Sequence, residues 1–470
     1  MTREGGHGGL AAGDSRNRAL RSQPSAAALV VAAALAAEVA LHLLEPRLAI
    51  TWSYAHLGRR ATLWWLAAAL IVLLPPAGAW AWRQPTATRP LGAVTWRTGL
   101  GALVLAAAIL ALGLAAPAPP VSIDPWFLVK SVAEGTGENG RWYLLLWTYE
   151  RVFALVRPAL HAAAFVRAAS GLAASVALPA LAAVARRLGR TRGEAVALTL
   201  LAWTAFGTAQ LVPGYLDIYP LALALTALYL ATALGTLAGD VHPGWPLTIA
   251  FVAPFFYIGL VLLLPSTAVI VLAGARGPQG RARLALGLGI ALAAAGVATL
   301  PGFGRPFVWG AFVARARADS GWQYGLSPTS SLLPLGYVAS GPHAREVLHT
   351  LLLVDGVGIV LLTGFGAWLP WREPAATLLA LLVGPWLAYL VTMDPLFGAF
   401  ADWDLFSYGA AATSLLGGWA FVSWGREHPR AFGWLLGLAL AAAGVHLLAR
   451  WNALDVDLPR HLLESPYHVG

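Results

Sequence analysis

The chain has 470 residues, of which 58% are hydrophobic and only 11% are charged, with a mean hydropathy of +0.67. A soluble protein of this size needs more polar side chains to cover its surface, so the composition predicts an integral membrane protein. The net charge is +9, but the arginines are spread between apolar stretches, which favours membrane orientation and no nucleic-acid partner. Cysteine is absent, which excludes disulfides, thiolate metal sites and cysteine nucleophiles.

Apolar stretches recur along almost the whole chain. Residues 1–25 are polar and rich in glycine, serine and arginine, which is typical of a disordered cytoplasmic tail. We expect an all-α polytopic membrane domain over 26–449 with roughly 13 transmembrane helices of about 20 residues each. A short outer tail follows at 450–470. The expected single spans are 26–45, 61–82, 98–117, 161–185, 195–212, 219–238, 284–301, 350–370, 375–392, 404–423 and 431–449.

Two stretches do not fit a single crossing. Residues 246–275 are long enough for two short spans, but Pro254 and Pro265 interrupt them. This pattern predicts a broken hairpin whose freed carbonyls need partners within the protein. Residues 142–157 carry Glu150 and Arg151 among aromatic and aliphatic side chains, which favours an amphipathic helix lying in the membrane interface.

Arginine sets the expected orientation. With the N-terminus inside and alternating spans, inner loops receive the arginine clusters within 186–192, 276–283 and 426–430. Two long outer segments remain, at about 118–160 and 302–349, and both mix Trp and Tyr with charge. We therefore expect a multi-pass plasma-membrane protein whose polar site lies on the extracytoplasmic side.

Acids are few, and several of them fall on the expected outer side. Asp124 in SIDPWF follows an apolar span, where a carboxylate can act as a general base or help hold a divalent cation such as Mg or Mn. Capping of a short helix with Pro125 in its first position is the alternative, and residue type alone favours it. Asp217 in GYLDIYP has the same two interpretations, a site carboxylate or a helix cap.

The DWD triplet is a sharper signal. Asp402 and Asp404 flank Trp403 at the entrance of an expected span, shortly after Asp394. Two acids separated by one residue can share a metal in an extended segment, and an indole can stack on a sugar face. Interfacial anchoring combined with helix capping explains the triplet equally well.

Other candidates are basic or lie within spans. Arg305, Arg315 and Arg317 on the second outer segment suit a phosphodiester, because a guanidinium binds phosphate oxygens in pairs. His343, near His349 and Glu346, can contact metal or phosphate, although isolated interfacial histidines are common. Walker A, HExxH and GxSxG motifs are absent from the sequence, so the corresponding ATPase, zincin and hydrolase assignments have no support.

The chain resembles the GT-C glycosyltransferases of prokaryotic membranes, especially the protein-mannosyltransferase and lipid A sugar-transferase branch. The resemblance covers most of residues 98–425. It rests on Asp124 in the first large outer segment, the aromatic amphipathic segment 142–157, and a span that ends in an arginine cluster, FVRAASGLAASVALPALAAVARRLG. The segments GYLDIYPLALALTALYLA, HAREVLHTLLLVDG and DWDLF are also similar.

The resemblance implies an inverting transfer of a sugar from a polyprenyl-phosphate donor, with Asp124 deprotonating the acceptor. Membrane lipids and that donor are the expected partners, and a divalent cation is a possible but uncertain cofactor. The expected substrate-binding residues are Asp217, Asp402, Trp403, Asp404, Arg305, Arg315, Arg317 and His343.

Two alternatives stay open. A secondary transporter would use Glu38, His42 and Asp355 as ionisable groups within the membrane. A lipid or polysaccharide flippase would need the arginines and aromatic residues but not Asp124.

Overall fold

The computed structural model describes residues 24–44, 123–135, 143–157, 161–209, 211, 217–299, 335–392 and 404–453. Within these ranges the chain forms helices and no strand, so the expected all-α class is confirmed there. The expected spans 61–82 and 98–117 lie outside these ranges, as do most of both tails and most of the outer segment 302–349. The total of 13 crossings therefore stays a prediction.

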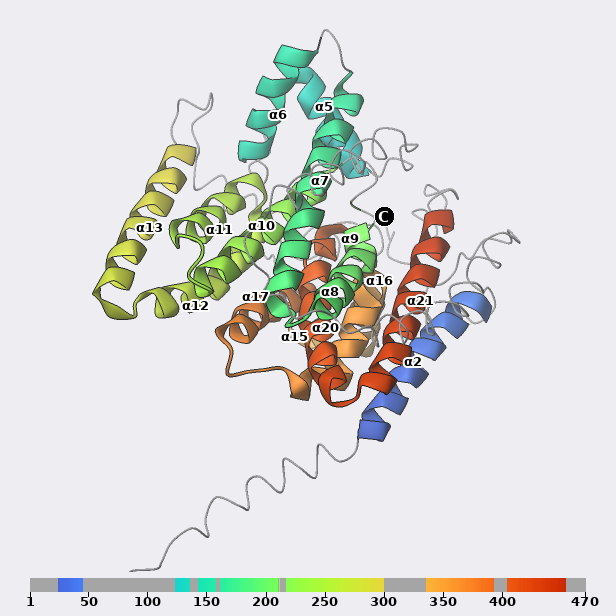
Figure 1. Cartoon of the computed structure of the whole chain (residues 1–470). Helices are drawn as coiled ribbons and strands as arrows, with labels where there is room; N and C mark the ends of the chain where they lie inside the picture. The colour runs from blue at the N-terminus through green and yellow to red at the C-terminus, as the bar shows by residue number, and fades with distance from the viewer. Residues whose placement is uncertain are drawn as a thin grey trace, which may run out of the picture.

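The helices of the first half are α2 (Pro24–Leu44), α5 (Ile123–Glu134), α6 (Tyr143–Val156), α7 (Ala162–Leu188), α8 (Arg192–Thr204), α9 (Phe206–Ala209), α10 (Tyr219–Leu237), α11 (Gly244–Phe256), η3 (Ile258–Leu263), α12 (Leu264–Gly274) and α13 (Gly277–Ala298). The second half contains α15 (Leu335–Val338), α16 (Gly341–Phe365), η5 (Gly366–Trp368), α17 (Pro374–Thr392), α19 (Asp404–Ser407), α20 (Ala410–Glu427) and α21 (Pro429–Ala453). Figure 1 shows their arrangement.

Six of these helical segments are long and apolar enough to cross a membrane: Ala162–Leu188, Tyr219–Leu237, Gly277–Ala298, Gly341–Trp368, Pro374–Thr392 and Pro429–Leu447. Each matches an expected span, with ends that differ by up to about ten residues. The largest difference is at α16, which begins at Gly341 because the polar turns before residue 350 remain helical. Such a set of helices is typical of a multi-pass membrane protein.

Two expected spans are divided in the structure. The span 195–212 becomes α8 and the short α9, separated at Ala205, whose backbone leaves the helical region (φ −54°, ψ 129°). The span 404–423 becomes the four-residue α19 and then α20. Both breaks fall at the same end of the bundle, where α9 and α19 pack against each other.

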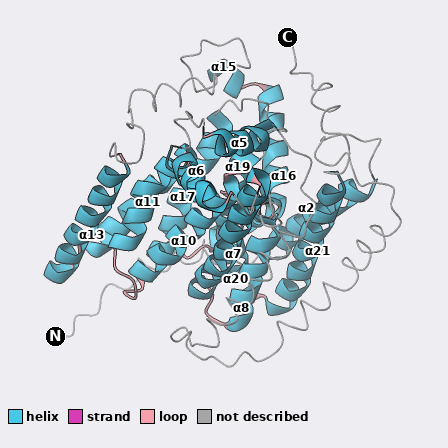
Figure 2. Ribbon diagram, turned by 90° about the horizontal axis from the view of Figure 1, so that it is seen from above, coloured by secondary structure: helices cyan, strands magenta, loops and turns pink. Residues whose placement is uncertain are grey.

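The centre of the bundle is formed by α7, α10, α16 and α20, with α13 at one edge and the α2–α21 pair at the other (Figure 2). Close approach of α16 and α20 depends on Gly417, because a Cβ there would collide with the backbone of Gly358 and Leu362. Almost every residue of α20 is buried, so this helix forms the axis of the core.

The broken hairpin over 246–275 is confirmed. Helix α11 ends at an extended Tyr257, the 3-10 segment η3 follows, and α12 returns. The first and last turns of this hairpin lie at the same end, since Gly244 and Gly274 both lie against α13. A carbonyl freed by the break, that of Gly259, accepts a hydrogen bond from the Tyr408 hydroxyl at 3.1 Å. The protein thus supplies the partner that an interrupted helix requires.

Charged loops meet at one end of the bundle, which we call the basic end: the α7–α8, α10–α11, α16–α17 and α20–α21 turns. Ion pairs join Arg187 to Asp240 at 2.8 Å and Arg190 to Glu373 at 3.5 Å. The Arg426 guanidinium binds both carboxylate oxygens of Glu194, at 3.0 and 2.9 Å. The sequence analysis placed the clusters 186–192 and 426–430 on one side, and the contacts of Glu194 with Arg426 confirm that these two loops share one end.

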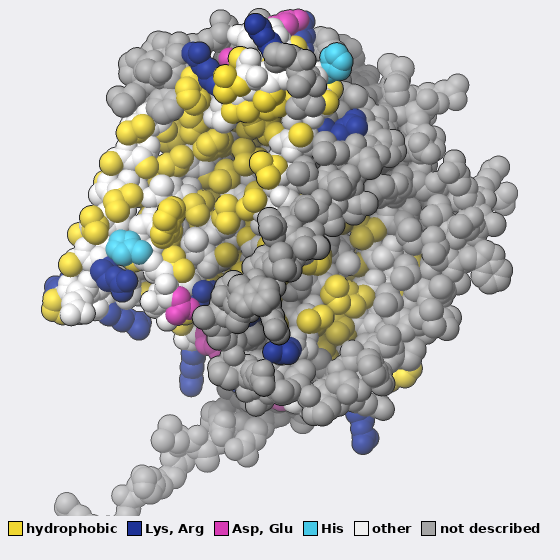
Figure 3. Space-filling model, turned by 45° about the horizontal axis from the view of Figure 1, so that its top comes forward, with side chains coloured by type: hydrophobic (Ala, Val, Ile, Leu, Met, Phe, Trp, Pro, Cys, Tyr) yellow, Lys and Arg dark blue, Asp and Glu magenta, His cyan; other side chains and the backbone are white. Residues whose placement is uncertain are grey.

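Between the two ends, the described part of the surface in Figure 3 is rich in hydrophobic side chains, and charged side chains lie mainly toward its upper and lower margins. Leu272, Leu286 and Leu292 are among the large apolar side chains that stay exposed, at 72%, 60% and 58%. A broad exposed apolar surface is costly in water and suits contact with lipid.

Candidate functional site

The end of the bundle opposite the arginine-rich loops is the candidate site, and we call it the acidic end after Asp124, Asp217 and Asp404, although its described part also carries Lys130, Arg151, Arg157 and Arg167. It comprises α5, α6, the start of α7, residues 217–219, the hairpin tip at 257–259, and α19. Helices α5 and α6 lie beside each other over the start of α7 (Figure 1). Tyr149 of α6 packs edge-on against Phe165 of α7, with ring centroids 5.5 Å apart. Residues Tyr143–Val156 of this segment form a helix, as expected; its position in a membrane interface stays a prediction.

Asp217 lies at the centre of the acidic end, and its side chain is only 1% exposed. Its Oδ1 accepts a hydrogen bond from the backbone N–H of Ile218 at 2.6 Å, just before α10 begins. Its own carbonyl accepts a hydrogen bond from the Ser170 hydroxyl of α7 at 3.2 Å. The GYLDIYP motif thus fixes α10 to α7, and the carboxylate is held inside the protein.

Tyr149 is the ionisable neighbour of Asp217. Burial, and then the charge of Asp217, raise the pKa of the Tyr149 hydroxyl well above its ordinary value of 10. The hydroxyl therefore keeps its proton at every physiological pH. Such a group can donate a hydrogen bond to a carboxylate or a substrate oxygen, but it cannot act as a base there.

Three tyrosines extend the acidic end toward the hairpin tip. Tyr219 packs edge-on against Tyr257, and Tyr257 against Tyr408, with centroids 5.5 and 5.7 Å apart. They come from the GYLDIYP motif, the hairpin tip and the turn after α19. Aromatic pairs of this geometry add stability beyond their burial. The three segments are therefore fixed relative to one another.

Helix α19, which begins at the last residue of the DWD triplet, belongs to this end, because it packs on α9, α10 and α16. The Trp386 indole donates a hydrogen bond to the Phe406 carbonyl at 2.9 Å, which fixes α19 from the side of α17. Asp404 is the first residue of α19. Its side chain lies outside the described part of the structure, and so do Asp402 and Trp403.

Asp124 is the second residue of α5, so its backbone lies inside the first turn and not at the N-cap position of the capping alternative, in which Pro125 is the first helical residue. Its side chain is outside the described set, as are Arg305, Arg315 and Arg317, and their expected roles stay predictions. Arg167 is a basic residue that the sequence analysis did not select. It lies three residues before Ser170 and therefore on the same face of α7.

His343 lies in the first turn of α16, where Ser340 caps the helix by accepting from its backbone N–H. The imidazole is 4% exposed. Its Nε2 is 2.6 Å from the Val391 carbonyl at the end of α17, and Nδ1 is 3.5 Å from Glu346. The Val391 contact joins α16 to α17, and the expected substrate-binding role of His343 stays a prediction.

Asp355 is the intramembrane acid of the transporter alternative, and it lies within α16. The side chain faces protein, not lipid: it is 2% exposed, and its Oδ1 accepts a hydrogen bond from Ser414 of α20 at 2.7 Å. The side chains of Glu38 and His42 on α2 lie outside the described residues.

Among the described residues, no three or more His, Asp or Glu side chains lie close enough together to bind a metal ion. The acids expected to do so, Asp124, Asp402 and Asp404, belong to the part of the chain whose side chains are not described. The divalent cation therefore stays an untested expectation.

Comparison with protein-family models, with curated proteins and with solved structures finds no match to this chain. The fold and the contacts above are therefore the observations on which a functional assignment depends.

Proposed function

We propose that this protein transfers a sugar from a polyprenyl-phosphate donor to a lipid, glycan or protein acceptor, with inversion, at the outer face of the plasma membrane. The observation that carries the proposal is the convergence of three acid-bearing segments at one end of the bundle. These segments are α5, GYLDIYP and α19. Because the arginine-rich loops occupy the opposite end, the positive-inside rule directs the acidic end outward.

The chemistry would need a base and a stabiliser of the leaving group. Asp124 takes the proton of the acceptor hydroxyl, and the acceptor oxygen forms a bond to the anomeric carbon. The bond between that carbon and the phosphate oxygen breaks, and the lipid phosphate leaves with the electron pair. Arginines of the second outer segment, Arg305, Arg315 and Arg317, would neutralise that phosphate.

Buried residues of the acidic end would give the site its shape. Asp217 and Tyr149 are held in place by α7 and α10, and Arg167 lies one turn from Ser170. A preorganised polar wall of this kind costs little reorganisation during reaction. Trp403 would contribute a flat face for the sugar, beside Asp402 and Asp404.

The test is transfer of a radiolabelled sugar from a lipid-linked donor by the purified chain in bilayers. Asp124→Asn keeps the shape of the side chain but cannot accept a proton, so transfer should fall about 100- to 10,000-fold. Asp240→Asn, an exposed acid at the basic end, is the matched control and should keep full activity. Full transfer by a folded Asp124→Asn variant would leave Asp124 with a structural role only.

A secondary transporter or flippase is the second candidate, and one observation favours it. Asp355 is an acid buried between apolar helices that are long enough to cross the membrane, a setting typical of transport pathways. This function predicts solute flux into vesicles that Asp355→Asn abolishes, and no product from the labelled donor. Transfer without flux would instead favour the glycosyltransferase.

A further inference from the structure

Helix α16 is interrupted near its middle, at Asp355, where φ is −158° and ψ is 57°. A second helical segment begins there. Asp355 Oδ1 accepts a hydrogen bond from the N–H of Gly358 at 3.1 Å, which is the contact of a helix N-cap. Gly358 is required at this place, because a Cβ would collide with the Asp355 carboxylate.

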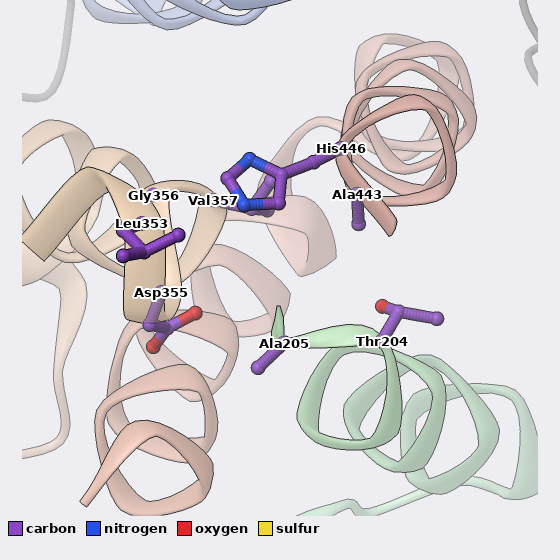
Figure 4. A pocket seen from close by; sticks show the side chains of 8 residues that line it. All are labelled: Thr204, Ala205, Leu353, Asp355, Gly356, Val357, Ala443 and His446. Carbon is purple, nitrogen blue, oxygen red and sulfur yellow. The ribbon is translucent and has the colours of Figure 1, made fainter. Parts of the chain in front are cut away.

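A second ionisable side chain lines the same pocket as Asp355. Asp355 of α16 and His446 of α21 both line one small pocket, together with Thr204 and Ala205 at the end of α8 (Figure 4). Both side chains are buried, at 2% and 4% exposure. The pocket has room for about one water molecule.

A capping role alone does not explain this arrangement. Asn, Ser or Thr would cap the second half of α16 as well as Asp does, without a charge between apolar helices. The cap also gives no reason for an imidazole on a different helix. A carboxylate that shares a low-dielectric pocket with a histidine stabilises the protonated imidazole through space, without direct contact.

Other charged groups on the elements that pack against α16 lie elsewhere or outside the described side chains. Arg426, Glu427 and Arg430 belong to the basic end, while His343, Arg345, Glu346 and His349 lie in the first turns of α16 itself. The remaining ones have side chains outside the described set: Glu38 and His42 on α2, Asp404 on α19, and Arg450 on α21, one turn after His446.

We propose that Asp355 and His446 together form a proton-binding site inside the helical bundle. A proton from water binds the lone pair of an imidazole nitrogen, the carboxylate stays ionised as its counter-charge, and release returns the proton to water. The charge of the pocket changes by one unit. Because the site lies at the break in α16, the change in charge falls on the interrupted part of that helix. The proposal depends on neither candidate function.

The experiment is a pH titration of the full chain in bilayer nanodiscs, with ¹⁵N-labelled histidine followed by NMR. Of the 11 histidines, His446 is assigned by loss of its signal in His446→Gln. We expect it to titrate in the native protein. In Asp355→Asn its proton affinity should fall about 10- to 1,000-fold, because the counter-charge is lost. Asn keeps the helix cap, so this variant separates capping from proton binding.

Asp240→Asn is the matched control, since it removes an exposed carboxylate at the basic end and should not move the His446 midpoint. A His446 signal that does not titrate, or an unchanged midpoint in Asp355→Asn, would overturn the proposal. If Asp355→Asn does not fold, Asp355→Ser replaces it. Ser also caps the helix but carries no charge, so the His446 midpoint should fall, and an unshifted midpoint would also overturn the proposal.

Discussion

The two ends of the bundle use acids in opposite ways. At the basic end, Asp240, Glu373 and Glu194 each face an arginine of a neighbouring loop, so short turns are joined by ion pairs. At the acidic end, Asp217 is buried against backbone groups, with Ser170 and Tyr149 beside it. Acids at the first end therefore complete a structural network. An acid at the second end is kept in a dry, hydrogen-bonded setting, which is the environment in which proteins tune chemical groups.

Within the basic end, two ion pairs differ in burial, and this difference predicts different contributions to stability. The Glu194 side chain is 4% exposed and Asp240 is 64% exposed. Glu194→Gln should lower the free energy of unfolding by about 2 to 3 kcal/mol, because Arg426 loses its charged partner in a partly buried place. Asp240→Asn should cost about 1 kcal/mol or less. Equilibrium unfolding in mixed micelles measures both, and equal losses would contradict the difference in burial.

Unfolding at alkaline pH tests the burial of Tyr149 at the acidic end. The pKa of Tyr149 is raised in the folded protein, so its neutral hydroxyl contributes stability that is complete below pH 10. That stability is lost as the pH rises above this value, by up to about 1.4 kcal/mol per pH unit. Tyr149→Phe should flatten the loss relative to the native protein. Parallel curves for the two proteins would show that the hydroxyl is not buried beside Asp217.

Trp403 tests whether the acidic end is a binding surface or an anchor. If the indole stacks on the donor sugar, Trp403→Ala should weaken donor binding by about 1 kcal/mol, or about fivefold in Kd. Isothermal titration with a soluble donor analogue measures the loss. Trp371, an exposed tryptophan at the basic end, is the matched control, and Trp371→Ala should bind normally. Equal affinities for all three proteins would leave Trp403 as an interfacial anchor.

The smallest expected effect concerns the hairpin tip. Tyr408→Phe removes the hydroxyl that donates to the Gly259 carbonyl and keeps the ring contact with Tyr257. Stability should fall by about 0.5 to 1.5 kcal/mol, since a buried acceptor loses its partner. Thermal unfolding in detergent measures the change. Native stability in this variant would mean that another group satisfies the carbonyl freed by the break.

Features with a local cause could be predicted from the sequence. Apolar runs predicted the long helices, Pro254 and Pro265 predicted the broken hairpin, and the arginine clusters predicted which loops share an end. The break at Asp355 contains no proline, and its local signal, an Asp-Gly dipeptide with Asp355 as N-cap, was not used in the sequence analysis. The rule that singled out Asp355, an ionisable residue within an apolar span, also applies to His446, and the sequence analysis did not use it there.

The burial of Asp217 and its pairing with Tyr149 could not be predicted, because they join segments that are far apart in the chain. The sequence left Asp217 as either a cap or a site residue. The structure shows an acid whose contacts are fixed by three helices, α6, α7 and α10. The tertiary arrangement, not the motif, makes that position chemically distinctive.

The central claim is that the two ends face opposite sides of the membrane, with the acidic end outward, and cysteine labelling tests it most directly. The chain contains no cysteine, and Ala133 of α5 and Ala238 after α10 are exposed at the acidic and basic ends. An impermeant maleimide applied to intact cells should label Ala133→Cys, and should label Ala238→Cys only after permeabilisation. Labelling of Ala238→Cys but not Ala133→Cys in intact cells would contradict the orientation and the outward-facing site.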